Sequence, residues 1–433
     1  MRCGVIAAAL LLLSVPFMSC CVEESAIADD VRTVVQDLVD GGYAASVVVG
    51  VLENGRTEYY GYGAQDGVQA AENTIFEIGS VTKIFTTLLL ADMATKGELS
   101  LEDPAETFLP ARVPSRDGKK ITLWHLATHT SGLPRMPDNF APADWNNPYM
   151  DYTAERLYDF LARYELPRDP GALWEYSNLG MGLLGHTLLL KSGMSYEDLV
   201  KERICDELGL EDTTITLTQE QRDRLAKACI GGVEIPNWDF DVLAGCGGLR
   251  SSAKDLLQFL SAEMGLKETR LDPAMELTQE GEFSGIGAEM IDAVGLGWLI
   301  PRGKELRWHD GATGGYCSFV GFDRESQRAA VVLLSRASGR AEIGGHVDSI
   351  GLHLLDPEFE LKAPEKPAMV DTSVYEDYVG EYEIAPGATV TISTEGNRLF
   401  AQVTGQDRFE IFPLSESRFF YNLSLHSFRH ILD

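Results

Sequence analysis

The chain has 433 residues, with 66 Asp and Glu against 36 Lys and Arg, and a formal net charge of -30. Such a surface repels phosphate backbones and anionic lipid heads, so the composition argues against nucleic-acid binding. The length suffices for a large core and two or three domains, and the 45% hydrophobic share is typical of a soluble globular protein.

The first predicted element is an export signal in residues 1–28. Its apolar run, residues 5–18, is too short to span a bilayer comfortably. Two cleavage sites remain open. The small residues of Ala26-Ile-Ala28 would release a soluble product, and Phe17-Met-Ser-Cys20 loosely resembles a lipoprotein box that would place a lipid anchor on Cys20. We expect an exported protein, periplasmic or secreted, with a membrane-anchored lipoprotein as the alternative. No later segment has the apolar length of a transmembrane helix.

Helical periodicity over Asp30–Val39 is followed by two strand-like stretches within Ser46–Tyr60, around an Asn54-Gly55 dipeptide that strongly predicts a hairpin. Residues 83–290 are then predicted to be mainly helical. The clearest helical segments are Ile84–Thr95, Ile121–His129, Thr153–Tyr164, Leu179–Ser192, Tyr196–Leu208 and Ala253–Met264.

Three strand candidates and a helix follow, at Glu305–Trp308, Ser318–Phe322, Arg328–Leu334 and Glu342–Leu355. Short connections favour antiparallel pairing, so we predict one antiparallel sheet made from both ends of residues 29–361 and covered by terminal helices. The predicted fold class is therefore α/β (α+β), with a mainly helical lobe beside the sheet. Clefts between two such lobes are favoured ligand sites.

A charged, proline-containing stretch at residues 362–370 is predicted to be a linker. Beyond it, residues 371–433 alternate like β structure at Ala388–Ser393, Arg398–Val403 and Arg408–Phe412, but a few hairpins of this length rarely close a barrel. Because Leu423–Asp433 does not continue the pattern, we expect an incomplete β domain.

Four of the seven cysteines lie outside the signal region, at Cys205, Cys229, Cys246 and Cys317. Their wide spacing contains no CxxC unit, and the chain has no HExxH, so we expect neither a metal site nor a cofactor. We expect most of them to be small buried core residues, while their pairing stays open.

Ser80 and Lys83 lie one helical turn apart where strand-like sequence gives way to the first long helix. An amine beside a serine hydroxyl can make it a nucleophile. The spacing alone is weak evidence, because about two such pairs are expected by chance and Ser251 with Lys254 is the other. Ser80 could instead be a simple helix N-cap, which is how we interpret Ser251 and Ser252, with Lys254 in solvent.

Three further segments decide between these interpretations. Tyr176 and Asn178 precede an apolar helix rich in glycine, and a Tyr-x-Asn at such a junction directs both side chains away from the core. His309 and Gly311 lie on a predicted edge strand, where small residues let the backbone approach a ligand closely. The third segment is Gly245–Phe259.

Ser-x-x-Lys, Tyr-x-Asn and His-x-Gly in this order resemble the serine β-lactamase and penicillin-binding-protein superfamily, in its class C-like branch, over roughly residues 30 to 355. Leu123–Leu133 and Gly247–Ser252 are similar to two further segments of that branch, and Tyr378–Tyr382 resembles the start of a small lipocalin-like β domain often attached to it. The resemblance implies a β-lactamase/transpeptidase-like fold and a serine hydrolase that acts through an acyl-enzyme. Its substrates would be small esters or amides, D-amino-acid peptides and β-lactams included.

The resemblance also implies residue roles. Ser80 would attack a carbonyl, Lys83 or Tyr176 would take its proton as a coupled pair, and the N–H groups of Ser80 and Ala312 would form an oxyanion hole. Asn178, with His309 and Gly311, would bind the substrate. An unperturbed lysine or tyrosine titrates near pH 10, so the base needs a lowered pKa.

His309 departs from the true lactamases, which have a lysine there that helps to hold a substrate carboxylate. Histidine is mostly neutral at pH 7, so an efficient class C-type β-lactamase is an alternative rather than the leading function. A non-catalytic penicillin-binding or sensor protein is the other alternative. We interpret His125, His129 and His186 as core or capping residues without clustered partners, and residues 139–148 as either a substrate loop or a surface excursion.

Overall fold

The computed structural model describes residues 25–421, except for residues 66, 231, 281–282, 289–290, 366–367, 369, 386, 406–407, 414 and 416. Most of the predicted export signal, with Cys20, lies outside the described residues, and so does Leu423–Asp433. No helix in the described ranges is long and apolar enough to cross a membrane.

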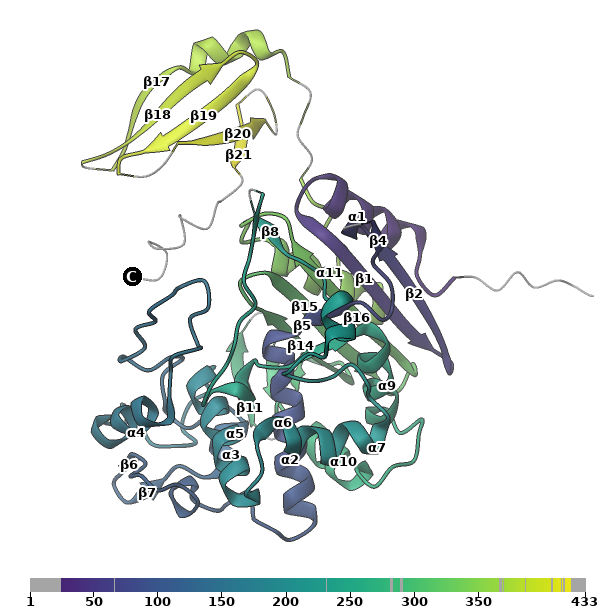
Figure 1. Ribbon diagram of the computed structural model, residues 1–433, viewed down its shortest axis with the longest axis vertical. Coiled ribbons are helices and arrows are strands. Elements are labelled where there is room, and N and C mark those ends of the chain that lie inside the picture. Colours follow the sequence, from purple (N-terminus) through teal and green to yellow (C-terminus); the bar gives the residue numbers. More distant parts are fainter. Residues whose placement is uncertain are drawn as a thin grey trace, which may run out of the picture.

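An antiparallel sheet of eight strands forms the centre of the molecule and joins both ends of the predicted domain (Figure 1). The hairpin turn falls on Asn54 and Gly55, whose φ angles of 50° and 77° are those that a type I′ turn needs. The order is β11-β12-β13-β14-β15-β16-β1-β2, with bounds Phe283–Ala288, Ile291–Val294, Leu299–Ile300, Leu306–Ala312, Tyr316–Asp323, Arg328–Arg336, Ala44–Glu53 and Arg56–Tyr62.

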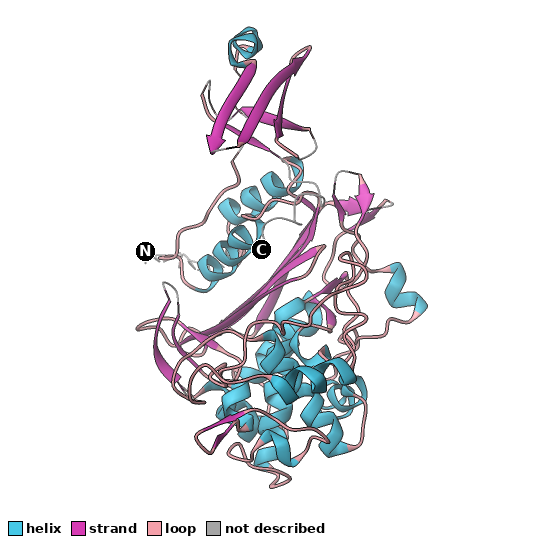
Figure 2. Cartoon of the chain, turned by 90° about the vertical axis from the view of Figure 1, so that its left-hand side faces the viewer, coloured by secondary structure: helices cyan, strands magenta, loops and turns pink. Residues whose placement is uncertain are grey.

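Two sets of helices cover the two faces of this sheet (Figure 2). Alternate residues of β1 separate the two cores: Val47 and Val49 pack with α1 (Asp29–Asp40) and α11 (Ile343–Leu355), whereas Val48 packs with the helical lobe. The sheet is therefore buried on both sides. This antiparallel sheet and its flanking helices confirm the predicted fold class.

The helical lobe contains every helix predicted for it. Its helices are α2 (Thr82–Thr95), α3 (Leu123–Ala127), α4 (Ala154–Arg163), α5 (Asn178–Ser192), α6 (Tyr196–Val200), α7 (Asp206–Leu208), α8 (Gln219–Asp223), α9 (Ala253–Glu263) and α10 (Asp272–Gln279). The predicted helix Tyr196–Leu208 is interrupted by a π-helical turn at Lys201–Cys205. The sequence analysis did not predict α8 or α10.

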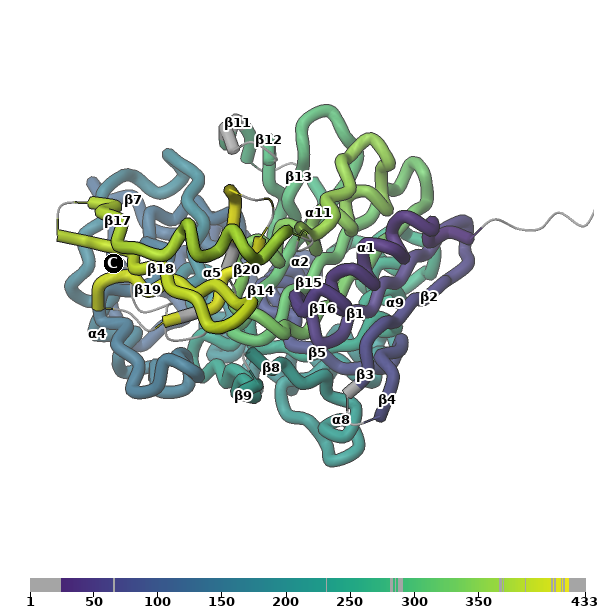
Figure 3. The backbone as a smooth tube through the Cα atoms, turned by 90° about the horizontal axis from the view of Figure 1, so that it is seen from above, coloured from purple at the N-terminus to yellow at the C-terminus, as the bar shows by residue number. Residues whose placement is uncertain are grey.

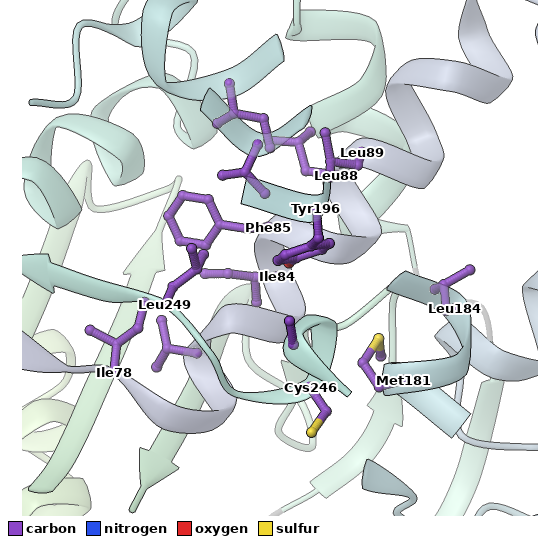
Figure 4. Close-up of a cluster of buried hydrophobic side chains, with 14 of the residues drawn as sticks. Ile78, Ile84, Phe85, Leu88, Leu89, Met181, Leu184, Tyr196, Cys246 and Leu249 are labelled. Atoms are coloured by element: carbon purple, nitrogen blue, oxygen red, sulfur yellow. The ribbon is translucent and has the colours of Figure 1, made fainter. Parts of the chain in front are cut away.

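Helix α2 is the axis of the lobe, since its residues 82–93 are all buried. Its Ile84, Phe85 and Leu88 belong to the same core as Met181 of α5 (Figure 4). Three of the four cysteines outside the signal region are buried and all four are free thiols, which confirms that most are core residues. A helix so enclosed holds Lys83 in its first turn, and the residues that directly precede it, in a fixed position.

A second antiparallel sheet follows residues 361–370, which contain no helix or strand where they are described. Its five strands pair in chain order; Figure 1 shows it apart from the eight-stranded sheet, and in the view from above in Figure 3 it is drawn over the side of the molecule that carries α4 and α5. The strands are β17 (Gly380–Ala385), β18 (Ala388–Glu395), β19 (Arg398–Val403), β20 (Phe409–Pro413) and β21 (Phe419–Tyr421). The described pairings do not close it into a barrel.

Candidate active site

Ser80 lies in a single 3₁₀ turn, Gly79–Val81, between the short strand β5 (Ile75–Glu77) and helix α2. Strand β5 pairs with β10 (Arg250–Ser252), and a buried ion pair of 3.3 Å joins Glu77 to Arg250 across them. Ser80 itself is only half-buried. The fold thus holds the backbone of Ser80 rigidly and leaves its hydroxyl accessible.

Lys83 is fully buried, one turn further along α2. Its Nζ donates to Ser80 Oγ at 2.7 Å and to the carbonyl oxygen of Cys246 at 2.7 Å. Burial lowers the pKa of Lys83 to about 8, because the ammonium loses most of its hydration. The amine is therefore held against the hydroxyl and can lose its proton near neutral pH.

Glycines of α5 bring the Cys246 carbonyl to this lysine. A Cβ added to Gly182 would lie 2.5 Å from Leu243 Cδ2, and one added to Gly185 would lie 2.9 Å from Gly245 Cα. Larger residues would push away the 3₁₀ turn that ends at Cys246. The glycines of this apolar helix thus provide an acceptor for Lys83.

Tyr176 lies two residues before α5, whose N-cap is Ser177. Lys83 Nζ lies 4.9 Å from the centroid of the Tyr176 ring. Burial, reinforced by the charge of Asp310, raises the pKa of the Tyr176 phenol. Asn178 begins α5, and its Oδ1 is buried without a hydrogen-bond partner in the described part of the chain. The structure thus brings Tyr176 to the Ser80 and Lys83 pair and leaves Asn178 with an unused acceptor.

Strand β14 passes directly beside Ser80. A Cβ on Gly79 would lie 2.8 Å from the amide nitrogen of Ala312, and one on Gly311 would lie 3.0 Å from the amide nitrogen of Ser80. The Thr313 N–H donates to Tyr316 on β15 at 3.0 Å, so in the alternating ladder the Ala312 N–H points away from β15. Two backbone donors, those of Ser80 and Ala312, therefore lie next to each other.

The prediction that β14 is an edge strand needs correction. It lies inside the sheet, between β13 and β15, but its described pairing with β13 is a single one, Leu299 with Trp308. From His309 to Ala312 the other side of β14 has no strand partner among the described residues. This free length is the part that faces Ser80.

His309 is buried, and its ring centroid lies 6.4 Å from that of Tyr176. Its Nδ1 donates to the carbonyl of Asp310 at 2.6 Å, which leaves Nε2 as a buried acceptor without a partner in the described ranges. Burial lowers the pKa of His309 to about 4, against the opposing charge of Asp310. The imidazole is therefore neutral at pH 7 and supplies no cation.

The prediction that His129 lacks clustered partners is wrong. Its ring packs on Tyr176 with 4.6 Å between centroids, its carbonyl accepts from the N–H of Glu175 at 2.8 Å, and its Nδ1 accepts from the N–H of Ser177 at 3.2 Å. His129 thus holds the chain on both sides of Tyr176. The left-handed φ of 58° at His129, which makes this possible, leaves no mark in the sequence.

The remaining segments considered in the sequence analysis have structural contacts. Ser252 caps α9 and Lys254 is exposed, so the second Ser-x-x-Lys pair is structural. His125 completes a capping box with Thr122. The stretch 139–148 is tied to the chain beside β5, because Asn147 and Asp239 exchange two hydrogen bonds of 2.8 and 2.9 Å and Trp238 N donates to Glu77.

A serine hydroxyl bonded to a buried lysine of lowered pKa, beside two free backbone donors, defines a serine acyl-transfer site between a sheet and a helical lobe. A family model described as Beta-lactamase matches residues 31–349, so this chain belongs to that family of serine hydrolases, which act through an acyl-enzyme. A second model, Domain of unknown function (DUF3471), matches residues 364–428.

Curated relatives agree. The chain is 30% identical over 316 residues to the D-alanyl-D-alanine-carboxypeptidase/endopeptidase AmpH of Escherichia coli K12. This alignment covers 69% of this chain and 81% of that protein. It is 29% identical over 377 residues to Penicillin-binding protein 4* of Bacillus subtilis, and this alignment covers 80% of this chain and 80% of that protein.

Solved structures share the fold. The β-lactamase/D-alanine carboxypeptidase of Yersinia pestis, complexed with citrate, superposes with a TM-score of 0.65 at 24% identity, over 75% of this chain and 98% of that one. The octameric penicillin-binding protein homologue of Pyrococcus abyssi superposes with a TM-score of 0.65 at 22% identity, over 92% of this chain and 94% of that one.

Proposed function

We propose that Ser80 carries the acyl group and that the chain hydrolyses small esters or amides, D-amino-acid peptides among them, in an exported compartment. The observation that carries the assignment of Ser80 is its 2.7 Å hydrogen bond with Lys83, an amine whose pKa burial has lowered to about 8. A base with a pKa near the working pH is the most effective one.

Lys83 is the better candidate for the base. Neutral Lys83 takes the Ser80 proton as Oγ attacks the carbonyl carbon, and Tyr176 keeps its own proton because burial raises its pKa. Collapse of the tetrahedral intermediate expels the leaving group with a proton passed on through Lys83 and Tyr176. Water then attacks the carbonyl of the acyl-enzyme, with water in place of Ser80 as the nucleophile and Ser80 Oγ as the leaving group. One difficult hydrolysis is thereby divided into two easier steps.

The remaining residues position the substrate. The N–H groups of Ser80 and Ala312 receive the developing oxyanion, and each such donor typically contributes about 2.7 to 4 kcal/mol of transition-state stabilisation. The unused Oδ1 of Asn178 suits a substrate amide N–H. Gly311 keeps the strand close to Ser80, and His309 offers a neutral acceptor.

Two alternatives stand beside this function. Efficient β-lactam hydrolysis is favoured by relatives named Beta-lactamase, such as that of Pseudomonas fluorescens at 28% identity over 73% of this chain, but the neutral His309 disfavours it. A non-catalytic penicillin-binding or sensor protein would keep these site residues and stop at the acyl-enzyme. The name of the AmpH relative supports D-alanyl peptides as substrates.

One experiment separates these functions. Mature protein and its Ser80→Ala variant are incubated with a short-chain nitrophenyl ester, a D-Ala-D-Ala peptide and a chromogenic cephalosporin, and intact mass is recorded alongside. We expect turnover of the ester and the peptide that Ser80→Ala abolishes. Turnover that survives Ser80→Ala would falsify the nucleophile, and a stable acyl mass without turnover would favour the sensor.

The acid–base pair has its own test. Lys83→Ala and Tyr176→Phe should each lower kcat by about two or more orders of magnitude, as expected for general acid–base groups. A near-normal rate in either variant would remove that residue from the mechanism. Lys254→Ala is the matched control, since this exposed lysine belongs to the structural Ser-x-x-Lys pair.

Export is proposed from the sequence alone. Soluble release and lipidation of Cys20 are distinguished by labelling the bacterial host with a radioactive or clickable palmitate. Label lost in Cys20→Ser identifies a lipoprotein, whereas unlabelled protein in the periplasm or medium identifies a soluble product. Protein that keeps residues 1–28 and stays in the cytoplasm would refute export.

A further inference from the structure

Arg135 lies beside the catalytic groups and has no counter-ion among the residues that the structure describes. Its guanidinium carbon lies 5.1 Å from the centroid of the Tyr176 ring, a ring that Lys83 Nζ also approaches. The side chain is exposed, and in the described part of the chain it forms no ion pair and donates no hydrogen bond.

Backbone hydrogen bonds fix the position of Arg135 beside the first turn of α5. The carbonyl of Arg135 accepts from the N–H of Leu179 at 3.2 Å, which ties it to the first turn of α5 beside Asn178. The neighbouring Ser177 hydroxyl donates to the carbonyl of Pro134 at 2.7 Å. A guanidinium held near an aromatic ring keeps its N–H groups in its own plane, from which they can bind a carboxylate in bidentate fashion.

The opposite side of the site is unsuited to a carboxylate. His309 is neutral, and the next residue along β14 is the half-buried Asp310. Asp310 shares a face of β14 with Leu306 and Trp308, which pack with α11. Helix α11 carries Asp348, and the Asp310 charge adds to burial in raising the pKa of Asp348. Neither carboxylate has an ion-pair partner among the described residues, and the buried Arg336 on that face donates to Cys317 Sγ.

We propose that Arg135 binds a carboxylate of the substrate and so replaces the cation that His309 cannot provide. This inference rests on the proposed function and deepens it, because it names the substrate class: esters or amides that carry a carboxylate held on the α5 side of Ser80. Penicillins, cephalosporins and peptides with a free C-terminus all contain such a group. Arg135 is then a specificity residue rather than a participant in proton transfer.

The test compares matched ester pairs. Nitrophenyl succinate and nitrophenyl butyrate differ in a carboxylate on the acyl side, and the acetate esters of 4-hydroxybenzoate and 4-hydroxybenzamide differ in one on the leaving group. We consider the pair in which the wild type prefers the charged ester to the neutral one. In that pair, Arg135→Gln should lower kcat/KM of the charged ester by roughly tenfold or more, mainly through a higher KM. The neutral ester should change less than about threefold.

Three further variants sharpen the result. Arg135→Lys should restore part of the preference, since lysine keeps the charge but loses the planar fork. Arg135→Glu should reverse the preference towards the neutral ester. Arg112→Gln removes another exposed arginine with no hydrogen bond or ion pair among the described residues and should change neither ester. An equal loss on charged and neutral esters through kcat would overturn the proposal, because it would mean that Arg135 acts on the base instead.

The design separates this inference from the proposed function. Ser80-dependent turnover with a preference that Arg135→Gln leaves unchanged refutes only the role of Arg135. If no ester is turned over through Ser80, the proposed function fails, and the role of Arg135 is then tested by binding alone. Succinate and succinamide are titrated calorimetrically into the Ser80→Ala protein with and without the Arg135→Gln substitution. A selective affinity for succinate that Arg135→Gln abolishes supports the role, and equal or absent binding of the two ligands refutes it.

Discussion

Gly311→Ala tests whether the contact between strand β14 and the Ser80 turn positions the oxyanion donors. A Cβ at residue 311 would overlap with the carbonyl oxygen of Ile78 and would lie 2.5 Å from Ser318 Oγ and 3.0 Å from the Ser80 nitrogen. Two of these three atoms belong to the backbone of the Ser80 segment. The added methyl therefore cannot be accommodated by a rotamer change and must separate the strand from that segment.

The expected loss follows from this geometry. Relief of the overlap requires a displacement of about 1 Å, and a misplacement of that size at a reacting centre costs about a hundredfold in rate. Loss of one oxyanion donor costs about 10² to 10³ in kcat by itself. We therefore expect kcat to fall by about two to three orders of magnitude, whereas overpacking should lower the free energy of unfolding by only about 1 to 3 kcal/mol.

The assay measures kcat on a short-chain nitrophenyl ester and stability by urea unfolding. Gly345→Ala is the control, because it is exposed on α11 and a Cβ there meets no atom within 4 Å. Alanine is a better helix former, so this variant should keep wild-type activity and be up to about 1 kcal/mol more stable. If Gly311→Ala retained activity within about threefold while folding normally, the assignment of Ala312 to the oxyanion hole would be wrong.

Three other predictions concern buried ionisable groups. Ester hydrolysis should rise with pH through the Lys83 pKa of about 8, since only the neutral amine accepts the Ser80 proton, and a profile flat from pH 6 to 9 would exclude Lys83 as the base. Lys83→Met should be inactive, yet urea unfolding at pH 7 should show it to be about 1 to 3 kcal/mol more stable than the wild type. This difference in unfolding free energy should shrink from pH 8 to 10.5, because the folded wild type already has a neutral Lys83 there while the lysine in the unfolded chain still binds its proton. Burial raises the pKa of Glu263 to about 8, so the free energy of unfolding of the wild type should fall from about pH 4.5 to 8. Glu263→Gln can keep the hydrogen bond with Gln279 and should remove that fall. Equal pH dependence of the unfolding free energy in both proteins would contradict the burial argument.

Local signals in the sequence were sufficient for five of the eight strands of the main sheet, β1, β2, β14, β15 and β16. Asn54 and Gly55 predicted the β1–β2 turn, and the apolar stretches at Arg328–Leu334 and Ser318–Phe322 correspond to β16 and β15. The short connections predicted one antiparallel sheet from both ends of the domain, but no signal in the sequence predicted that β1 pairs with β16, nearly 300 residues away. Strands β12 and β13 were missed because they have only four and two residues, and β11 was missed because its sequence lacks a clear alternation of apolar and polar residues.

The site residues were predictable to different degrees for a physical reason. Ser80, Lys83, Tyr176 and Asn178 lie in short motifs at element boundaries, and such motifs survive as sequence patterns. The groups that surround them act through the backbone or through charge at a distance. Cys246 contributes only its carbonyl, and Arg135 is one arginine in a loop, so neither has a spacing that marks it. A pattern search finds side chains that react, but it misses the backbone that positions them.

Lys83 shows why that difference matters for the choice between site and decoy. Ser251 with Lys254 has the same spacing, yet Ser252 caps its helix and Lys254 lies in solvent, where its ammonium keeps its hydration. At Lys83 the glycines of α5 and the buried face of α2 exclude water, and a shift of the pKa from 10.5 to about 8 corresponds to roughly 3 kcal/mol against the ammonium. Folding alone would not favour a lysine in that position. The two hydrogen bonds of Lys83, to Ser80 Oγ and to the Cys246 carbonyl, offset part of this cost, and the remainder is the lowered proton affinity that a base for Ser80 requires.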